Sequence, residues 1–439
     1  MMAHPWQDRI RMADPVRRTG RVRRIRATHV EADGPALPLG AHCRIAGQRS
    51  DGPAPILAEV VRVDRESISL VPFEDGASTF PGAEVVALPA SQHVAVGDAF
   101  LGRAVDALGR AIDEGMNPKG TTLAPLHGET VSPLDRASPR QMLPTGIRAI
   151  DGLLTLARGQ RVGIFAAAGV GKTSLITQLA AQVDADVVVL VLVGERGREV
   201  EALWSGLPSS IRNRTSLVAA TSDQPAMSRV RAGHYAMALA EHWRKQGKQV
   251  LLLLDSVTRL AMAMREIGLA AGEPPTVRAY TPNVFAAIPR LIERAGAMRA
   301  GGSISAVMTV LSETDDVDDP ISEMMKSLLD GHIILSRTLA EQGHFPAIDV
   351  SRSVSRQAEA LRSPEQAVHV RQVAAWISAY EQSRAMRQAG LYASGSDALI
   401  DEAIARHASI TAFLRQGSTE ASSPEKSYAL LEALQGVHG

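Results

Sequence analysis

The chain has 439 residues, 45% of them hydrophobic, which is typical of globular proteins and is long enough for about two or three domains. Lysine plus arginine and aspartate plus glutamate both number 47, so the formal net charge is zero. This balance argues against a protein whose main task is to hold the phosphates of a nucleic acid. Aromatic residues make up only 4% of the chain, which leaves few rings for stacking on single-stranded bases.

The one cysteine, Cys43, excludes an internal disulfide framework and suits a reducing compartment. No apolar run approaches the roughly 18 residues that span a membrane. The opening stretch MMAHPWQDRIRMADP lacks the apolar core of a signal peptide. We therefore expect a soluble, cytoplasmic protein.

The N-terminal part of the chain is rich in arginine, with Arg9, Arg11, Arg17, Arg18, Arg21, Arg23, Arg24 and Arg26. We assign residues 1–18 to an arginine-rich arm, which is either a solvated, partly disordered segment or a tether to an anionic membrane or an acidic partner. From about Thr19 to Ala90, short apolar runs such as AHCRIAG and GAEVVAL alternate with glycine, proline and polar clusters. This pattern predicts a small all-β domain over residues 19–91, with Cys43 in its core.

Between residues 92 and 360 the apolar runs become continuous. They read VGIFAAAG (162–169), DVVVLVLVG (186–194), QVLLLLDS (249–256), ISAVMTVL (304–311) and GHIILS (331–336). Continuous runs of this length suit parallel strands that are buried on both faces, and helical stretches separate them, so we predict a doubly wound α/β domain. Residues 361–439 are predicted to form a helical domain, in which Ser363 is the N-cap and Pro364 the first residue of a helix.

The segment GIFAAAGVGKTSL follows a predicted strand and leads into a predicted helix, as a phosphate-binding loop does. The usual pattern G-x-x-x-x-G-K-[ST] has a glycine where this chain has Ala166, which is tolerable if its φ is negative. Lys172 is placed to bridge the β- and γ-phosphates of a nucleotide, and the Thr173 hydroxyl to coordinate Mg²⁺. The predicted nucleotide-binding residues are Ala168, Gly169, Val170, Gly171, Lys172, Thr173 and Ser174.

Two acidic residues follow predicted strands. Asp255 ends LLLLD, where it either holds magnesium as a Walker B acid or caps the next helix. Glu195, in LVGERGREVE, is the candidate to polarise the attacking water, unless this segment is only an exposed turn. Arg196 and Arg198 then serve as γ-phosphate sensors or as ion-pair partners of Glu195 and Glu199.

The segment GHFPAIDVSRSVSR contains Phe345, Arg352 and Arg356. An arginine that reaches into the site of a neighbouring subunit suits a ring-shaped ATPase. Phe345 either stacks on adenine or belongs to the core, and the pattern alone favours the core.

These motifs, together with LARGQRVGIFA, AATSDQPA, REIGLAAGEPPT, FAAIPRLIERAG and DDPISE, resemble the catalytic subunits of rotary ATPases, and most of all the type III secretion export ATPases. The likeness runs from about residue 19 to the end of the chain. It implies a multidomain protein with a small N-terminal β-barrel, a central RecA-like P-loop ATPase domain and a C-terminal α-helical domain. It also makes Ala166 a trait of the family.

Carried over by position, the resemblance makes Lys172 the phosphate lysine, Thr173 a magnesium ligand, Asp255 the Walker B acid, Glu195 the catalytic glutamate and Arg356 an arginine finger acting in trans. Non-catalytic subunits of the rotary enzymes have glutamine at the position of the catalytic glutamate. Phe345 falls where the family has an adenine-packing tyrosine, which reverses the core interpretation. The segment AYTPNVF departs from the family's GYTPSVF at Ala279 and Asn283, and DDPISEMMKSLLDG departs at Met324 and Met325, which puts fine specificity in doubt.

The resemblance implies a Mg²⁺-dependent ATPase that forms a homohexamer at the inner membrane face of a secretion apparatus. Its expected partners are stalk and regulatory stator proteins, chaperone–substrate complexes that it releases and unfolds, and the inner membrane, but no nucleic acid. FAAAGVGKT favours the injectisome branch, whereas SDQPA and the valine of GVGK also occur in the flagellar branch.

Two other classes of protein stay open. A hexameric RNA translocase of the transcription-terminator type would need exposed aromatic rings in its N-terminal barrel, where only Phe73 and Phe80 are available. A non-hydrolysing structural subunit is disfavoured by Glu195 and Arg356 together.

Overall fold

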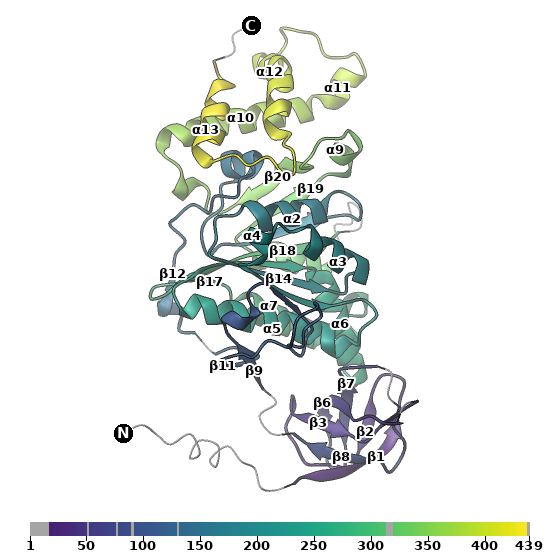
Figure 1. Cartoon of the computed structure of the whole chain (residues 1–439). Coiled ribbons are helices and arrows are strands. Elements are labelled where there is room, and N and C mark those ends of the chain that lie inside the picture. The colour runs from purple at the N-terminus through teal and green to yellow at the C-terminus, as the bar shows by residue number, and fades with distance from the viewer. Residues whose placement is uncertain are drawn as a thin grey trace, which may run out of the picture.

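The computed structural model describes residues 17–50, 52–75, 78–88, 92–129, 131–312 and 319–436. A β-barrel lies at one end of the elongated molecule, an α/β body in the middle and a group of helices at the other end (Figure 1). Most of the predicted arginine-rich arm, including Arg9 and Arg11, lies outside the described residues. Within those ranges, no helix combines the length and the apolar character that crossing a membrane requires.

The N-terminal barrel closes around small and branched side chains. On β6 the side chains of Ile56, Ala58 and Val60 point inward and alternate with more exposed neighbours. In spatial order its strands are β1 (Thr19–Ile25), β2 (Val30–Ala32), β7 (Ile68–Pro72), β6 (Ile56–Val63), β3 (His42–Ile45) and β8 (Glu84–Ala87), with a short β4 (Gln48–Arg49) and β5 (Gly52–Pro53) pair beside them. Cys43 is buried in this core, as predicted, and burial raises the pKa of its thiol to about 12.

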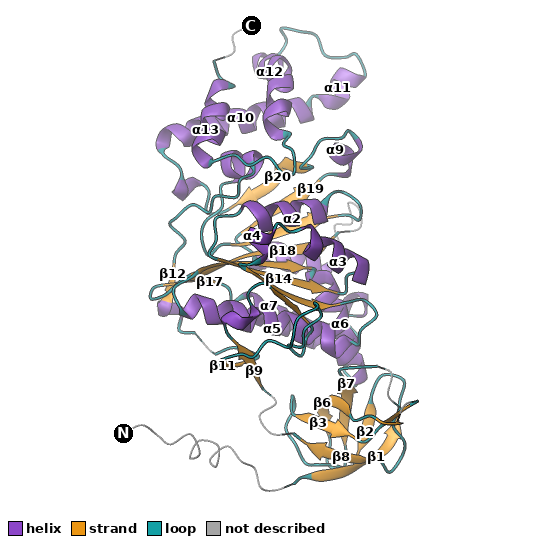
Figure 2. Ribbon diagram, viewed as in Figure 1, coloured by secondary structure: helices purple, strands orange, loops and turns teal. Residues whose placement is uncertain are grey.

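The central body is built on a 10-stranded sheet, as the continuous apolar runs predicted (Figure 2). Its main path is β10 (Arg103–Val105), β15 (Thr215–Ala220), β14 (Val187–Val193), β16 (Gln249–Asp255), β18 (Ser303–Leu311), β13 (Arg161–Ala166), β19 (Gly331–Leu335) and β20 (Ile348–Ser355), with β12 (Arg136–Ala137) and β17 (Gly296–Met298) at one side. Neighbouring strands from β10 to β19 run parallel, whereas β20 is antiparallel to β19. A separate pair, β9 (His93–Val96) and β11 (Thr122–Pro125), links this body to the barrel.

Helices cover both faces of the sheet, which gives the doubly wound arrangement that the sequence predicted. They are α2 (Lys172–Gln182), α3 (Gly197–Gly206), α4 (Ser209–Arg212), α5 (Ala226–Lys245), α6 (Val257–Ala270), α7 (Pro282–Ile292), α8 (Pro320–Leu328) and α9 (Arg337–Glu341). One buried cluster joins the sheet to α5, α6 and α7, and a second joins the opposite face to α2 and α3. The sheet is therefore buried on both faces, and ligands can reach it only at the strand ends.

The C-terminal helices are α10 (Pro364–Gln382), α11 (Arg384–Gln388), α12 (Ala398–Leu414) and α13 (Pro424–Ala433). The predicted start of α10 is confirmed: the Ser363 hydroxyl accepts a hydrogen bond from the Gln366 N–H, and Pro364 is the first helical residue. Trp376, Phe413 and Leu431 form a core with Leu153, which comes from a π-helical turn (Ala149–Leu154) that precedes β13. This shared core attaches the helices to the central body.

Candidate nucleotide site

The loop between β13 and α2 has the backbone that phosphate binding requires. Ala166 is the last residue of β13 and is buried. Its φ is not positive, so the backbone at this position does not require a glycine. Gly169 and Gly171 have φ values of 81° and 92°, in the left-handed region that glycine adopts freely. The replaced glycine of the usual pattern is therefore not needed here, as the sequence analysis expected.

Three charged side chains meet at the carboxyl edge of the sheet, although they are far apart in the sequence. Lys172 Nζ, at the start of α2, donates to Glu195 Oε1 at 3.2 Å and to Asp255 Oδ1 at 2.6 Å. Glu195 follows β14, and Asp255 is the last residue of β16. The lysine, glutamate and aspartate side chains are only 12%, 9% and 4% exposed, so this ion-paired cluster lies in a largely dry environment.

Burial and neighbouring charges act in opposite directions on Asp255. Burial raises the pKa of its carboxyl above the ordinary value, the nearby Glu195 carboxylate adds to that shift, and the Lys172 ammonium opposes it. A hydroxyl from the next strand also stabilises the carboxylate, because Thr309 Oγ1 donates to Asp255 Oδ1 at 2.7 Å.

The oxygen atoms that this edge offers as metal ligands suit Mg²⁺ better than a softer metal. Mg²⁺ is commonly held by one or two carboxylates together with substrate phosphates, rather than by a cage of protein ligands. Asp255 supplies a carboxylate, and Thr173 lies exposed in the first turn of α2. Within the described ranges, no three His, Cys, Asp or Glu side chains gather as a metal cage.

Arg259 is a member of the site that the sequence analysis missed. Its Nε lies 3.7 Å from Glu195 Oε1, and its stem packs so close to Gly194 that a Cβ there would be 2.8 Å from Arg259 Cδ. The segment DSVTR could have indicated its position, because the first turn of α6 places a residue four positions after Asp255 back near the end of the strand. Thr309 was missed because a single hydroxyl in the run SAVMTVL gives no pattern.

Phe345 lies against the phosphate loop rather than in the core. A Cβ on Gly171 would be 3.4 Å from Phe345 Cε1, and the phenylalanine is 46% exposed. Its ring therefore offers an open face next to the start of α2. Arg196 and Arg198, in contrast, are exposed at the beginning of α3, while the cations beside Glu195 are Lys172 and Arg259.

Arg356 lies at the opposite edge of the sheet from the other predicted catalytic residues. It follows β20, whose last residue, Ser355, pairs with Gly331 at the beginning of β19. Its backbone N–H donates to the Asp330 carbonyl, and its side chain reaches the Lys326 carbonyl at 3.3 Å. Since the strands beside β19 end at the far edge, Arg356 does not reach the Lys172 cluster of its own chain.

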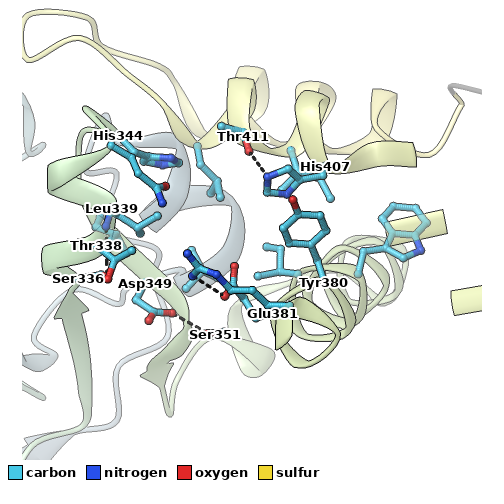
Figure 3. Close-up of a pocket in the computed structure, with 18 of the residues that line it drawn as sticks. Ser336, Thr338, Leu339, His344, Asp349, Ser351, Tyr380, Glu381, His407 and Thr411 are labelled. Atoms are coloured by element: carbon cyan, nitrogen blue, oxygen red, sulfur yellow. Dashed lines mark hydrogen bonds and ion pairs between the residues drawn. The ribbon is translucent and has the colours of Figure 1, made fainter. Parts of the chain in front are cut away.

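A separate pocket of about 570 Å³ lies where α9 and β20 face α10 and α12 (Figure 3). The His407 ring stacks on Tyr380, with 3.6 Å between ring centroids, and His344 faces the same pocket from the central body. None of the Lys172, Glu195 and Asp255 side chains lines this pocket, so it is distinct from the nucleotide site.

The fold and the loop geometry define a P-loop nucleotide-binding protein. Residues 146–355 match the model of the ATP synthase alpha/beta family nucleotide-binding domain, and residues 362–433 match that of the T3SS EscN ATPase C-terminal domain. A flagellum-specific ATP synthase of Bacillus subtilis (strain 168) is 42% identical over 98% of this chain and 98% of its own. A type 3 secretion system ATPase of Xanthomonas euvesicatoria is 41% identical over 95% of this chain and 94% of its own.

Solved structures agree with these relatives. The assembled ATPase EscN of the enteropathogenic E. coli type III secretion system superimposes with a TM-score of 0.89 at 39% identity, over 94% of this chain and 99% of EscN. EscN in complex with its central stalk EscO gives a TM-score of 0.85 at 38% identity over the same shares. The chain belongs to the family of the type III secretion and flagellum-specific ATPases, and it is an ATP-hydrolysing export ATPase.

Proposed function

We propose that this protein hydrolyses Mg²⁺-bound ATP to drive type III protein secretion at the cytoplasmic base of an injectisome, where it releases and unfolds chaperone-bound substrates. The observation that carries the catalytic part is the meeting of Lys172 with Glu195 and Asp255 at one end of the sheet, beside a glycine-containing loop. Type 3 secretion system ATPases at 41% identity and the fit to EscN support the assignment to secretion.

Each residue of the site has a proposed role. Lys172 and the backbone amides of Ala168, Gly169, Val170, Gly171 and Ser174 hold the phosphates of ATP. Thr173 and Asp255 hold Mg²⁺, which neutralises phosphate charge when it is bound. Glu195 orients the attacking water, and Arg259 keeps its carboxylate in place. Phe345 stacks on the adenine, and Arg196 senses the γ-phosphate.

We further propose that the active form is a homohexamer in which Arg356 of one protomer completes the site of the next. The position of Arg356 at the far edge of its own sheet supports this arrangement, because a trans-acting residue must face outward. EscN is described as an assembled ATPase and as a complex with its central stalk. The remaining proposed partners are a regulatory stator protein, chaperone–substrate complexes and the inner membrane surface.

A flagellum-specific export ATPase is the second candidate, since relatives with that name reach 42% identity over 98% of the chain. The two functions separate in living cells. Expression in a strain that lacks its injectisome ATPase should restore effector secretion, whereas the flagellar candidate predicts restored swimming in a strain that lacks its flagellar ATPase. Restoration of swimming without secretion would overturn the injectisome assignment.

The deciding biochemical experiment is steady-state ATP hydrolysis over a wide range of protein concentration, with Mg²⁺ and with EDTA. We expect magnesium-dependent turnover that rises more than linearly with protein concentration. Constant specific activity while light scattering shows only monomers would contradict a site shared between protomers. Added RNA should leave the rate unchanged, because Phe73 is buried between the barrel and the central body, and Phe80 alone is too few exposed rings for stacking on bases.

A further inference from the structure

The loop between α12 and α13, residues 415–423, is bonded to the nucleotide-binding body through Gln416. Its backbone N–H donates to the Phe345 carbonyl at 2.9 Å. Its side-chain Nε2 donates to the Gly146 carbonyl at 2.6 Å and to the Glu420 carbonyl at 2.7 Å. Gln416 is only 5% exposed, so each of these polar groups is satisfied within the protein.

Arg148 organises this loop from the other side. Its backbone N–H donates to Gln416 Oε1 at 2.8 Å, and its Nε donates to the Phe413 carbonyl at 2.9 Å. The two terminal nitrogens of the guanidinium bond to the Arg415 carbonyl and to the Glu420 carboxylate, and this contact lowers the pKa of Glu420. Arg148 is 8% exposed, and lysine could not supply these donors from one fixed plane.

We propose that Arg148 is a positioning residue for the base-binding side of the nucleotide site. Its guanidinium fixes the loop on both sides of Gln416, through the Phe413 and Arg415 carbonyls and the Glu420 carboxylate, and Gln416 holds the backbone of Phe345, whose ring lies against Gly171. The inference rests on the proposed stacking of Phe345 on adenine. Through these contacts, the loop between α12 and α13 and the buried Arg148 together set the affinity for the nucleotide, far from the phosphates.

The phosphate side of the site depends much less on this loop. Leu175, Ile176 and Leu179 anchor α2 in the core of the central body. The loop reaches the C-terminal half of α2, where Gln182 Nε2 donates to the Ser418 carbonyl at 3.3 Å and to the Glu420 carbonyl at 3.0 Å, and Gln178 Nε2 donates to the Gly417 carbonyl at 3.5 Å. Loss of Arg148 should therefore weaken the hold on the base and leave the hold on the phosphates unchanged.

The test compares ATP with inorganic pyrophosphate, which has phosphates but no base. Arg148→Ala should raise KM for ATP by about 5-fold or more, which corresponds to a weakened contact between a base and an aromatic ring. Its kcat should stay close to that of the wild type, because the interaction is not specific to the transition state. The inhibition constant of pyrophosphate should not change.

Arg362→Ala is the matched control. Arg362 is a second arginine that joins the same two parts of the molecule, through Nε to Thr155 Oγ1 at 3.1 Å and Nη2 to the Leu153 carbonyl at 2.8 Å. It should leave KM for ATP unchanged. Should it raise KM as much as Arg148→Ala does, or should the pyrophosphate constant rise in parallel with KM, Arg148 would have only a structural role and the proposal would be overturned.

Glu420→Gln provides a milder variant if Arg148→Ala does not fold, and it should shift KM in the same direction by less. An unchanged KM in the folded variants would overturn the proposal. Phe345→Ala separates this inference from the proposed function. If Phe345→Ala leaves KM unchanged, the adenine contact itself fails; if only Phe345→Ala raises KM, the role of Arg148 alone fails. The double variant should be no worse than Phe345→Ala, because both act on one contact.

Discussion

The two edges of the central sheet differ in how complete they are. At the carboxyl edge, Lys172, Glu195 and Asp255 are already paired within one chain and almost fully buried. At the other edge, Arg356 is exposed, and its side chain and backbone N–H donate to neighbouring backbone carbonyls. The difference follows from topology, because parallel strands end together whereas the antiparallel β20 returns the chain to the opposite edge. On the proposed mechanism, one chain assembles the phosphate-binding part of the site, and its Arg356 completes the site of a neighbouring chain.

The largest effect is expected at the exposed edge. Arg356→Ala should reduce kcat by roughly 10³- to 10⁵-fold, the range for an arginine finger that stabilises charge on a transferring phosphoryl group. Mixing Arg356→Ala with Glu195→Gln protomers should restore part of the activity, because some interfaces then contain both intact residues. Arg352→Ala, on the same strand, should lose far less. A mixture as inactive as its components would contradict the shared site.

At the buried edge, Glu195→Gln should lower kcat by about 10²- to 10⁴-fold, the contribution of a general base. Nucleotide binding should persist, because the amide oxygen can still accept a hydrogen bond from Lys172. Single-turnover kinetics and equilibrium nucleotide binding measure the two effects separately. Glu199→Gln, on the adjoining α3, is the matched control and should behave as the wild type. Unchanged turnover in Glu195→Gln would show that another residue orients the water.

A smaller effect is expected at Thr309, which contacts the cluster through one hydrogen bond. Thr309→Val keeps the shape of the buried side chain and removes the donor to Asp255. Turnover should fall by about 10-fold, since a hydrogen bond to a charged group is worth about 1.5–3 kcal/mol. Thr309→Ser keeps the hydroxyl and should retain most of the activity. Equal losses in the two variants would point to packing instead.

The last effect concerns stability rather than turnover and involves a buried carboxyl outside both edges. Asp151 accepts hydrogen bonds from Thr145 and Gly146, yet burial raises its pKa to about 6 from an ordinary value of 3.8. Its contribution to the free energy of unfolding is therefore fully present below about pH 4 and is lost as the pH rises to about 6, by up to about 3 kcal/mol. Denaturant unfolding should show a weaker pH dependence in Asp151→Asn across this window. Parallel curves for the two proteins would disprove the shift.

Much of this site could be predicted because its residues follow buried strands. The runs before Ala166, Glu195 and Asp255 are apolar throughout, and the carboxyl ends of parallel strands meet, so the ion-paired cluster was foreseeable. The antiparallel direction of β20 was not, because the mixed polar and apolar residues of IDVSRSVS do not reveal the direction of a strand. The hydrogen bond between Arg148 and Gln416 joins positions 268 residues apart, and no local pattern marks either residue.

The position of Arg356 has a consequence for unassembled chains. On the proposed mechanism, a newly made protomer can hold ATP but cannot turn it over at full rate. An open, linear oligomer would always contain one site that lacks the Arg356 of a neighbour, and only closure into a ring would complete that site. The rate of ATP hydrolysis would then report how many interfaces between protomers have formed, rather than how much protein the cell has made.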